Sequence, residues 1–325
     1  MFLVTGGAGF IGSNLVAALD EAGHAVTVND ELGTGDKWRN LARRRLADFV
    51  PPSDLMRWLA GRKLDAVLHL GANSDTTATD ADQVMAANFR LSLALLDWCT
   101  EHRVPFIYAS SAATYGDGSA GFDDDGSPEA LKELRPLNLY GWSKHLFDRA
   151  VADRVAKGAA LPPQWAGLKF FNVFGPNEYH KGHMRSVAAV AFDQTRAGAP
   201  VRLFKSYRDG IADGDQRRDF VHVADTVDVM LWLLERPGVS GLFNVGSGRA
   251  RSFRELALAL FDALGREPDI EYVEMPEKLR ARYQYFTEAP LDRLRQAGYD
   301  RQFTPLELGV RDYVSRFLAA PDPYR

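Results

Sequence analysis

The sequence is poor in three features that often direct interpretation: cysteine, long apolar runs and an excess of charge of one sign. Its 325 residues include a single cysteine, Cys99. A lone thiol excludes an internal disulfide framework and a cysteine-based zinc site, and no metal site is predicted. Because Cys99 lies in the apolar run LALLDWCTEH, we predict that it is buried in a helix.

No stretch reaches the roughly 18 consecutive apolar residues of a membrane-spanning helix. The first residues, MFLVTGG, have the pattern of a strand and lack the basic and apolar regions of a signal peptide. The formal net charge of −4 gives no electrostatic reason to expect nucleic acid or an anionic membrane as a partner. These absences predict a cytoplasmic protein that binds neither nucleic acid nor a membrane.

Short apolar strands alternate with amphipathic helical patterns through the first 170 residues. The helical patterns include SNLVAALDEAG and NFRLSLALLDWCTEH. The alternation predicts an α/β fold, a doubly wound parallel sheet of the Rossmann type with helices on both faces. The expected strands are FLVTG, AVTVND, DAVLHLGA, FIYASS and GLKFFNV.

The second half is less regular. We predict a dinucleotide-binding domain over residues 1–171 and a smaller, mixed α/β, mainly substrate-binding domain over 172–325, with 217–245 packing back onto the first. No low-complexity linker separates the two halves, so we expect them to pack tightly. The expected elements are the helices VAAVAFDQTRAG, TVDVMLWLLER and SFRELALALFDALG, the strand LFNVGSG, and the loops PNEYHKGH and KSYRDGIADGDQ.

The first strand runs into the glycine-rich segment VTGGAGFIGSN, with Gly6, Gly9 and Gly12 three residues apart. Glycine permits a tight turn and lets the backbone approach a pyrophosphate, which the exposed N–H groups of the following helix can hold. The alternative is a tight turn without a ligand. The strand before it and the helix after it favour dinucleotide binding.

Asp30 closes the second strand, 18 residues after Gly12, with Glu31 next to it. A carboxylate at this place accepts hydrogen bonds from the adenosine ribose and favours NAD. Lys37 or Arg39, which follow in TGDKWRN, could instead compensate the 2′-phosphate of NADP. From the residues alone, the choice between NAD and NADP stays open.

Tyr140 and Lys144 in LYGWSKHLFDRA are four residues apart, on one face of a helix. An ammonium beside the phenol should favour the phenolate and lower the tyrosine pKa. Upstream, FIYASSAATYG places Ser111 at the end of a strand, where its hydroxyl can hydrogen-bond the substrate oxygen that Tyr140 serves. A chance pair on a helix surface would not explain the glycine turn, the serine corner and YxxxK in this order.

These motifs resemble those of extended short-chain dehydrogenases/reductases that act on nucleotide sugars, and more narrowly those of ADP-L-glycero-D-manno-heptose 6-epimerases, which make a lipopolysaccharide precursor. The glycine turn and YxxxK are typical of the whole superfamily, whereas the HKG loop and the RYQ–FT segment are typical of the narrower group. The similarity runs nearly end to end, through YASSAATYG, LNLYGWSKHLFD, FNVFGP, HKGHM, RRDFVHVADTVDVMLWLLE, GLFNVGSGRA and RYQYFTEAPL.

The resemblance implies that hydride leaves C6 of the heptose and returns to the opposite face, so the carbonyl intermediate must turn over. Tyr140 would exchange a proton with the oxygen of the intermediate in one orientation, and Lys181, in the HKG loop, would do so in the other. A lysine suits this role because, when partly desolvated, it gains or loses a proton readily. Alternatively, Lys181 neutralises a diphosphate or lies in solvent. Related dehydratases carry an acid pair after the position of Ser111, and decarboxylases carry a glutamate; here Ala112 and Ala113 stand there.

The resemblance also implies the ligand contacts. Phe10 and Ile11 would lie in the phosphate turn, and Lys37 at the position that contacts the phosphate of NADP. We therefore expect tightly held NADP, with NAD as the alternative, and a homo-oligomer, the group suggesting a homopentamer. The nicotinamide would meet Asn73, Ser74, Asn88, Lys144 and Val173, and the nucleotide sugar would meet Asn172, His183, Phe204, Arg218 and Tyr283.

Two features depart from the expected pattern: His183 replaces a small residue, and KSYRDGIADGDQ is longer and more charged than usual. Arg218 could instead pair with Asp219 or Asp225, and Tyr283 could be a core aromatic. The rival functions are another nucleotide-sugar epimerase, such as a UDP-sugar 4-epimerase that needs no Lys181, a one-way reductase, or a binding module that has lost its chemistry. A binding module is disfavoured because Ser111, Tyr140 and Lys144 are all present.

Overall fold

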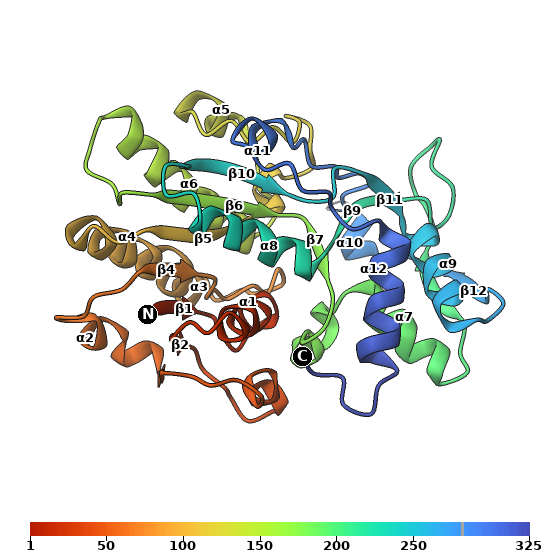
Figure 1. The fold of residues 1–325 in the computed structure, drawn as a ribbon. Helices are drawn as coiled ribbons and strands as arrows, with labels where there is room; N and C mark the ends of the chain where they lie inside the picture. Colours follow the sequence, from red (N-terminus) through yellow and green to blue (C-terminus); the bar gives the residue numbers. More distant parts are fainter. Residues whose placement is uncertain (281–282) are drawn as a thin grey trace.

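The computed structural model describes residues 1–280 and 283–325 and contains one large parallel sheet with two smaller sheets beside it (Figure 1). Arg282, the first residue of the RYQYFTEAPL motif, lies outside the described residues. The large sheet has seven strands in the order β10-β6-β5-β4-β1-β2-β3, and every neighbouring pair is parallel. The predicted doubly wound α/β fold is confirmed. Its strands are β1 (Phe2–Thr5), β2 (Val26–Asn29), β3 (Asp48–Val50), β4 (Ala66–His69), β5 (Phe106–Ser111), β6 (Trp165–Phe170) and β10 (Gly241–Val245).

Alternate residues of the central strands β1, β4 and β5 enter two separate cores, because successive side chains of a strand point to opposite faces. On β1, Leu3 belongs to one core and Val4 to the other. The first face is covered by α2 (Leu55–Leu59), α4 (Leu91–His102), α5 (Pro128–Glu133) and α6 (Leu139–Ala156), and α3 (Ala81–Met85) packs against α6. The second is covered by α1 (Phe10–Glu21), α8 (Val223–Leu234) and α11 (Asp292–Gln296). Cys99 is fully buried in α4, as predicted.

The smaller sheets lie beyond one end of the large sheet, on the right in Figure 1. The first joins β7 (Asn172–Phe174), β9 (Arg217–His222) and β11 (Ala250–Ser252), and the second joins β8 (Val201–Phe204) and β12 (Ile270–Val273). They pack with helices around a third core. The helices of this region are α7 (Val187–Arg196), α9 (Phe253–Leu264), α10 (Glu277–Arg280) and α12 (Leu306–Tyr313).

The prediction of one strand over GLKFFNV is wrong. β6 ends at Phe170, the N–H of Phe171 bonds the carbonyl of Val245 at 3.0 Å, and β7 starts at Asn172 in a different sheet. Residues 166–171 are all buried, across the end of β6, so hydrophobicity does not reveal the change of sheet. β9 pairs within the second sheet, whereas α8 and β10 return to the first. The division into two domains stays a prediction.

Three further sequence assignments differ from the structure. The short strand β3 was not predicted, and only Val50 of its three residues is buried. The strands β8, β9, β11 and β12 of the second half were also missed. The expected loop PNEYHKGH contains a 3₁₀ helix, Tyr179–Met184. Among the described residues, no helix combines the length and the apolar character needed to cross a membrane.

A fully buried ion pair joins α6 to the large sheet. Lys169 of β6 donates to the Asp148 carboxylate at 2.7 Å and to the Thr114 hydroxyl at 2.8 Å. Asp148 also accepts from Ser110 at 2.7 Å and from Tyr108 at 3.2 Å, both on β5. The charge of Asp148 is therefore compensated on all sides by groups of two adjacent strands.

We predict that Lys169→Met lowers the free energy of unfolding by about 3–5 kcal/mol, because it leaves the Asp148 carboxylate buried without a cation. Chemical denaturation measures the change. The matched control is Arg154→Met, which breaks the exposed pair of α6 with Asp97 and should cost at most about 1 kcal/mol. Equal effects of the two substitutions would contradict the structural importance of the buried pair.

Candidate active site

The glycine turn lies between β1 and α1 and is closed by contacts that only glycine permits. Gly6 has φ +65°, and a Cβ there would lie 2.6 Å from the backbone nitrogen of Gly71. A Cβ on Gly12 would lie 2.1 Å from the carbonyl oxygen of Gly6. Gly9 is the N-cap of α1, whose first N–H groups face the turn, and Phe10 is buried behind it while Ile11 is half-buried. This cradle fits the pyrophosphate of a dinucleotide.

Asp30, just beyond β2, is held beside the same turn. One carboxylate oxygen accepts from Ala8 N–H at 2.9 Å; the other accepts from Lys37 Nζ at 2.6 Å and from Glu31 N–H at 2.7 Å. Lys37 also donates to the carbonyl of Glu31 at 2.8 Å. Arg39 instead stacks on the ring of Tyr324 at 4.5 Å. Of the two cations that the sequence left open, Lys37 is therefore the one beside Asp30.

Tyr140 and Lys144 lie on the first turns of α6, close to the serine corner at the end of β5. The serine corner and α6 can pack this closely because residue 141 is glycine. A Cβ there would lie 2.7 Å from the carbonyl oxygen of Ala113. Burial raises the pKa of Tyr140, and the Ser111 hydroxyl offsets part of that rise. The expected lowering of the tyrosine pKa by Lys144 is wrong for the protein without cofactor, because loss of hydration and the carboxylate of Asp148 both raise it.

Lys144 is the buried cation of this corner. Burial lowers its pKa to about 8, and the carboxylate of Asp148, one helical turn further on, raises it in part. Sequence reasoning missed Asp148, because the ion-pair partner Lys169 is distant in the chain. The only available signal was a charged residue on the buried face of α6.

Asn73 and Ser74 follow β4 on a loop that faces the corner, Asn73 half-buried and Ser74 exposed. Asn88 lies behind this loop and is fully buried. It accepts from Asn73 N–H at 2.8 Å and donates to the Asn73 carbonyl at 2.9 Å and to the Ser143 hydroxyl at 2.9 Å. The side chain of Asn88 thus bonds protein groups and holds the Asn73 loop to α6, and its contact with a cofactor stays a prediction.

Lys181 lies in the segment 177–186, called the lysine loop, on the 3₁₀ helix that follows β7. It is half-buried, with its Nζ 5.3 Å from the centre of the Phe10 ring. It is therefore placed against the glycine turn, which contradicts the alternative of a lysine free in solvent. Gly182, with φ +56°, lets the chain turn directly after it. Burial lowers the pKa of Lys181, and the carboxylate of Glu178 raises it in part.

Glu178 anchors the lysine loop and is another residue that the sequence did not single out. It is fully buried and accepts from Ser186 N–H at 2.5 Å, from the Ser186 hydroxyl at 2.6 Å and from the Tyr313 hydroxyl at 3.0 Å. His183, on the exposed side of the loop, lies near Asp75 and lowers the pKa of that carboxyl group, although less than the hydrogen bonds from Thr77 do. The Thr76 hydroxyl lies 3.9 Å from Met184 Sδ, so the Asn73 loop and the lysine loop touch.

A second cluster gathers where the substrate nucleotide was expected. Arg218 is buried between Tyr283, 5.1 Å from its guanidinium carbon, and Phe253 at 5.5 Å. Phe204 contacts the ring of Tyr283 edge-on. The alternative ion pair of Arg218 is wrong: among the described residues, Asp219 accepts from the 247–248 turn and from Ala289, and Asp225 accepts from Thr304.

The long charged segment before RDF extends this cluster. Tyr207 N–H donates to the Tyr285 hydroxyl at 3.1 Å, and Arg208 lies over the Tyr285 ring at 5.8 Å. The segment therefore packs against residues 283–285. Asn172, at the start of β7, is exposed, and Val173 is half-buried next to it.

A model of the NAD dependent epimerase/dehydratase family matches residues 2–246. The chain belongs to this family. It is 51% identical over 329 residues to ADP-L-glycero-D-manno-heptose-6-epimerase of Nitratidesulfovibrio vulgaris (strain DP4), with all of both chains covered. It is 46% identical over 335 residues to the enzyme of that name from Fusobacterium nucleatum subsp. nucleatum, again over the whole of both chains.

Solved structures agree with this assignment. The crystal structure of Helicobacter pylori ADP-L-glycero-D-manno-heptose-6-epimerase superposes with a TM-score of 0.80 at 29% identity, covering 97% of this chain and 95% of that one. The UDP-glucose 4-epimerase of Thermus thermophilus, in complex with NAD, superposes with a TM-score of 0.75 at 26% identity, covering 98% and 99%. The resemblance drawn from the sequence motifs is confirmed.

We predict that the amine of Lys144 titrates near pH 8 in the cofactor-free protein, since burial lowers its pKa to about 8. Asp148→Asn removes a charge that raises this pKa, so the midpoint should move to lower pH. NMR of the protein with ¹³C-methylated lysines measures the midpoint. Asp153→Asn, exposed on the same helix, is the control and should leave it unchanged. A wild-type midpoint near the ordinary value of ~10.4 would contradict the prediction.

Proposed function

We propose that the protein is an ADP-heptose epimerase, which converts ADP-D-glycero-D-manno-heptose to ADP-L-glycero-D-manno-heptose by inversion at C6. The observation that carries the proposal is the pairing of two proton-transfer groups with one glycine turn: Tyr140 with Ser111 on the α6 side and Lys181 against Phe10. The names of the full-length relatives support this substrate. In this role the protein supplies a precursor of the lipopolysaccharide core.

The cofactor is a nicotinamide dinucleotide, and we infer that it is NADP. The glycine cradle and the N-terminus of α1 would hold its pyrophosphate, and Lys37 beside Asp30 supplies the cation that a 2′-phosphate needs next to a carboxylate. When bound, the nicotinamide accepts hydride from C6 and gives it back. The loop of Asn73, which Asn88 holds in place, and Val173 would border the ring.

Tyr140 is the acid/base on one side of the sugar. Burial raises its pKa and favours the protonated phenol, which can donate to the substrate oxygen, and Lys144, with its ammonium form favoured by Asp148, would stabilise the phenolate that results. Ser111 would hydrogen-bond the substrate oxygen and keep it within hydrogen-bonding distance of the phenol. These roles explain why the serine corner and α6 approach closely at Gly141.

Lys181 is the acid/base for the opposite pose of the intermediate. Such a group must both accept and donate a proton in one catalytic cycle, which is easiest with a pKa near the working pH. Burial lowers the pKa of Lys181 toward that range, and Glu178 limits the change. Because Glu178 also holds Ser186, it positions the loop that carries the lysine.

Arg218 and Tyr283 form the binding site for the substrate nucleotide. The guanidinium of Arg218 is buried between two rings and provides a cation for the diphosphate. Phe204 and the segment around Tyr207 border the adenosine, while Asn172 and His183 lie toward the sugar. We further expect a homo-oligomer in the cytoplasm.

The test is to follow the C6 stereochemistry of ADP-D-glycero-D-manno-heptose with the purified protein and to identify the nucleotide that it retains. We expect inversion without net turnover of bound NADP. Lys181→Met should lower kcat by about 10²–10⁴-fold, the usual contribution of a positioned acid/base. Lys63→Met, which removes an exposed lysine between α2 and β4, is the control and should stay within about threefold of the wild type.

A full rate of C6 inversion in Lys181→Met would show that one acid/base suffices, and a wild-type protein that epimerises UDP-glucose but not ADP-heptose would be a UDP-sugar 4-epimerase. Stoichiometric consumption of the cofactor would instead indicate a reductase. Either result would refute the epimerisation of ADP-heptose by two acid/base groups.

The cofactor preference has its own test. Lys37→Ala should weaken binding of NADP by at least about tenfold and leave binding of NAD nearly unchanged, because a charged hydrogen bond to phosphate contributes about 1.5–3 kcal/mol. Titration of the cofactor-free protein with each dinucleotide measures both constants. Equal losses for the two would mean that Lys37 only supports Asp30.

A further inference from the structure

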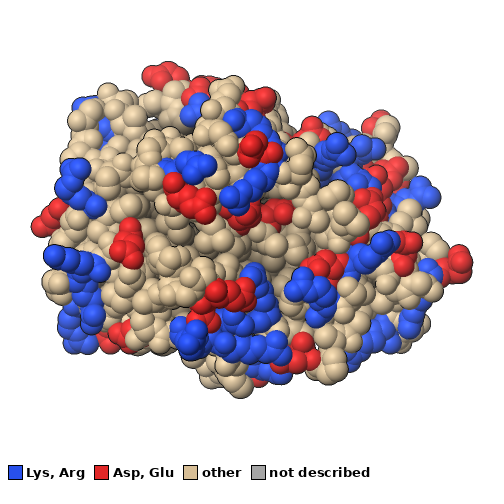
Figure 2. All heavy atoms as spheres, in the orientation of Figure 1, with Lys and Arg blue, Asp and Glu red and all other residues tan. Residues whose placement is uncertain are grey.

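The segment 322–325, called the DPYR segment, lies where three parts of the site meet. It contacts α1, the lysine loop, and the 3₁₀ helix Asp36–Leu41 that carries Lys37. In Figure 1 the end of the chain lies beside the green lysine loop. In Figure 2, basic and acidic side chains gather at the lower middle of the molecule, where Figure 1 places this segment.

Two residues of the lysine loop bind the DPYR segment. The hydroxyl of Tyr179 donates to the carbonyl of Pro323 at 2.8 Å, and its ring meets the ring of Tyr324 edge-on, with the centroids 5.2 Å apart. The backbone N–H of Arg325 donates to Asn177 Oδ1 at 3.0 Å. Tyr324 is only 8% exposed, so its ring is packed into this contact. The loop is thus tied to the segment shortly before its lysine.

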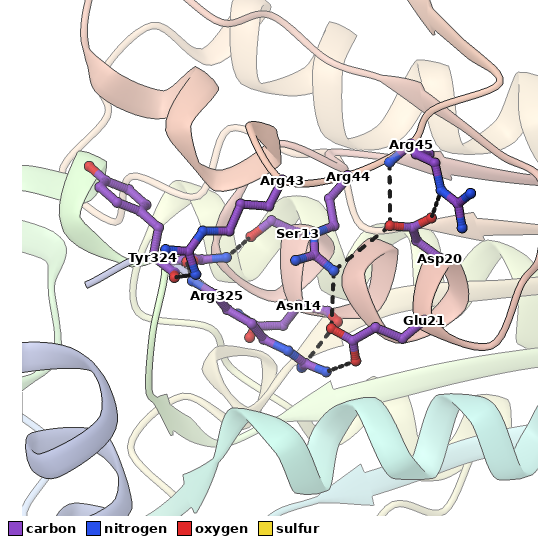
Figure 3. A network of polar contacts seen from close by, with 10 residues as sticks. Ser13, Asn14, Asp20, Glu21, Arg43, Arg44, Arg45, Tyr324 and Arg325 are labelled. Atoms are coloured by element: carbon purple, nitrogen blue, oxygen red, sulfur yellow. Dashed lines mark hydrogen bonds and ion pairs between the residues drawn. The ribbon is translucent and has the colours of Figure 1, made fainter. Parts of the chain in front are cut away.

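The same segment binds α1 and the 3₁₀ helix that carries the cofactor lysine. The guanidinium of Arg325 reaches Glu21 of α1 at 3.1 Å (Figure 3). Arg43 donates to the carbonyl of Tyr324 at 3.1 Å, and Arg39 lies over the ring of Tyr324 at 4.5 Å. The tyrosine ring therefore contacts a side chain of the lysine loop and a side chain of the 3₁₀ helix.

Asn177 connects the start of the lysine loop to the glycine turn. It is fully buried and has φ +72°, a left-handed conformation that asparagine adopts more readily than most residues. Its Nδ2 donates to the Ser13 hydroxyl at 3.0 Å, and its carbonyl accepts from Asn40 Nδ2 at 3.1 Å. Asn40 donates in turn to the carbonyl of Ala8, in the glycine turn, at 2.8 Å. Both ends of the Asn177 amide are thus bonded, one to α1 and the other to the DPYR segment.

The lysine loop therefore has two anchors. The buried carboxylate of Glu178 holds the far end of the loop at Ser186. The DPYR segment holds the near end against α1. Lys181 lies between these anchors, with its Nζ 5.3 Å from the centre of the Phe10 ring. Both anchors bear on catalysis, because a displacement of about 1 Å can cost a reaction about 10²-fold in rate.

We propose, building on the acid/base role proposed for Lys181, that the DPYR segment positions this lysine and that Tyr324 is the central positioning residue. The segment fixes the near end of the lysine loop against α1 and the glycine turn, so proton transfer by Lys181 depends on it. Tyr140 is held instead by α6 and the serine corner, and its proton transfer is independent of the segment.

Steady-state kinetics of the full-length protein with ADP-D-glycero-D-manno-heptose test the proposal. Tyr324→Ala should lower kcat by about 10- to 100-fold and leave KM within about threefold, because the nucleotide cluster of Arg218 lies on other elements. Tyr324→Phe keeps the ring and should restore the wild-type kcat. An unchanged kcat in folded Tyr324→Ala would overturn the proposal, since a segment that only stabilises the fold has this effect.

A double-mutant cycle shows whether Tyr324 acts through Lys181. In the Lys181→Met background, Tyr324→Ala should lower kcat by less than about twofold, because the group that Tyr324 positions is already absent. The two losses would multiply if Tyr324 acted by another route, such as through Arg39 on the cofactor. Multiplied losses would overturn the proposal.

A second variant keeps the test independent of the stability of the first. Asn177→Gly retains the left-handed backbone, removes the side chain that accepts from the N–H of Arg325, and should give the same kinetic pattern. Arg45→Gln is the control and should keep kcat within about twofold of the wild type. Like Arg325, Arg45 pairs with a carboxylate of α1, but its side chain is 92% exposed and it turns to Asp20, away from the segment (Figure 3). An equal loss in Arg45→Gln would overturn the proposal.

Hydrogen exchange reports on the loop without using the reaction. The amides of residues 178–186 should exchange at least about tenfold faster in Tyr324→Ala than in Tyr324→Phe, whereas those of α6 should be unchanged. Unchanged exchange in the loop would overturn the positioning role, whatever the activity. Faster exchange in a protein whose wild type does not epimerise ADP-heptose would refute the proposed function and leave the hold of the segment on the loop established.

Discussion

The buried carboxylate of Asp148 is the contact on which the catalytic geometry depends. It receives Lys169 from β6 and Ser110 and Tyr108 from β5, and it lies on α6 one turn after Lys144. A single buried charge therefore holds the catalytic helix to two strands at once. Burial of such a charge is costly unless every lone pair is matched. A change in the strands, the serine corner or the helix would consequently disturb the other two, because all three meet at this carboxylate.

Loss of hydration acts on each proton-transfer group of the corner by disfavouring its charged form, and the surrounding charges adjust the effect. It raises the pKa of Tyr140 and lowers those of Lys144 and Lys181. Two buried carboxylates, Asp148 and Glu178, then raise the lysine values in part. Neither carboxylate has to touch a substrate to influence the reaction, because charge acts through the poorly hydrated interior over several ångströms.

Asparagine side chains connect the loops of the site to one another through the backbone. Asn88 ties the Asn73 loop to α6 through Ser143, and Asn14 ties the glycine turn to the start of the lysine loop. Asn40 donates to the carbonyls of Ala8 and Asn177, across the same boundary. An amide can donate to two carbonyls at once, so one side chain can align two loops that lie far apart in the sequence.

The sequence by itself determined the class of the fold and the positions of the main chemical groups. The alternation of short apolar strands with helical patterns predicts the parallel sheet, the glycine spacing predicts the cradle, and YxxxK with Ser111 predicts the corner, because each of these signals is local in the chain. The motif resemblance added Lys181, Arg218 and Tyr283, which no local rule singles out.

Tertiary structure decided what depends on distant partners. It ends β6 before β7, places Lys37 rather than Arg39 beside Asp30, turns Asn88 inward and raises the pKa of Tyr140 where adjacent charge predicted a fall. Burial and long-range contacts are properties of the folded chain, and local sequence patterns carry little information about either.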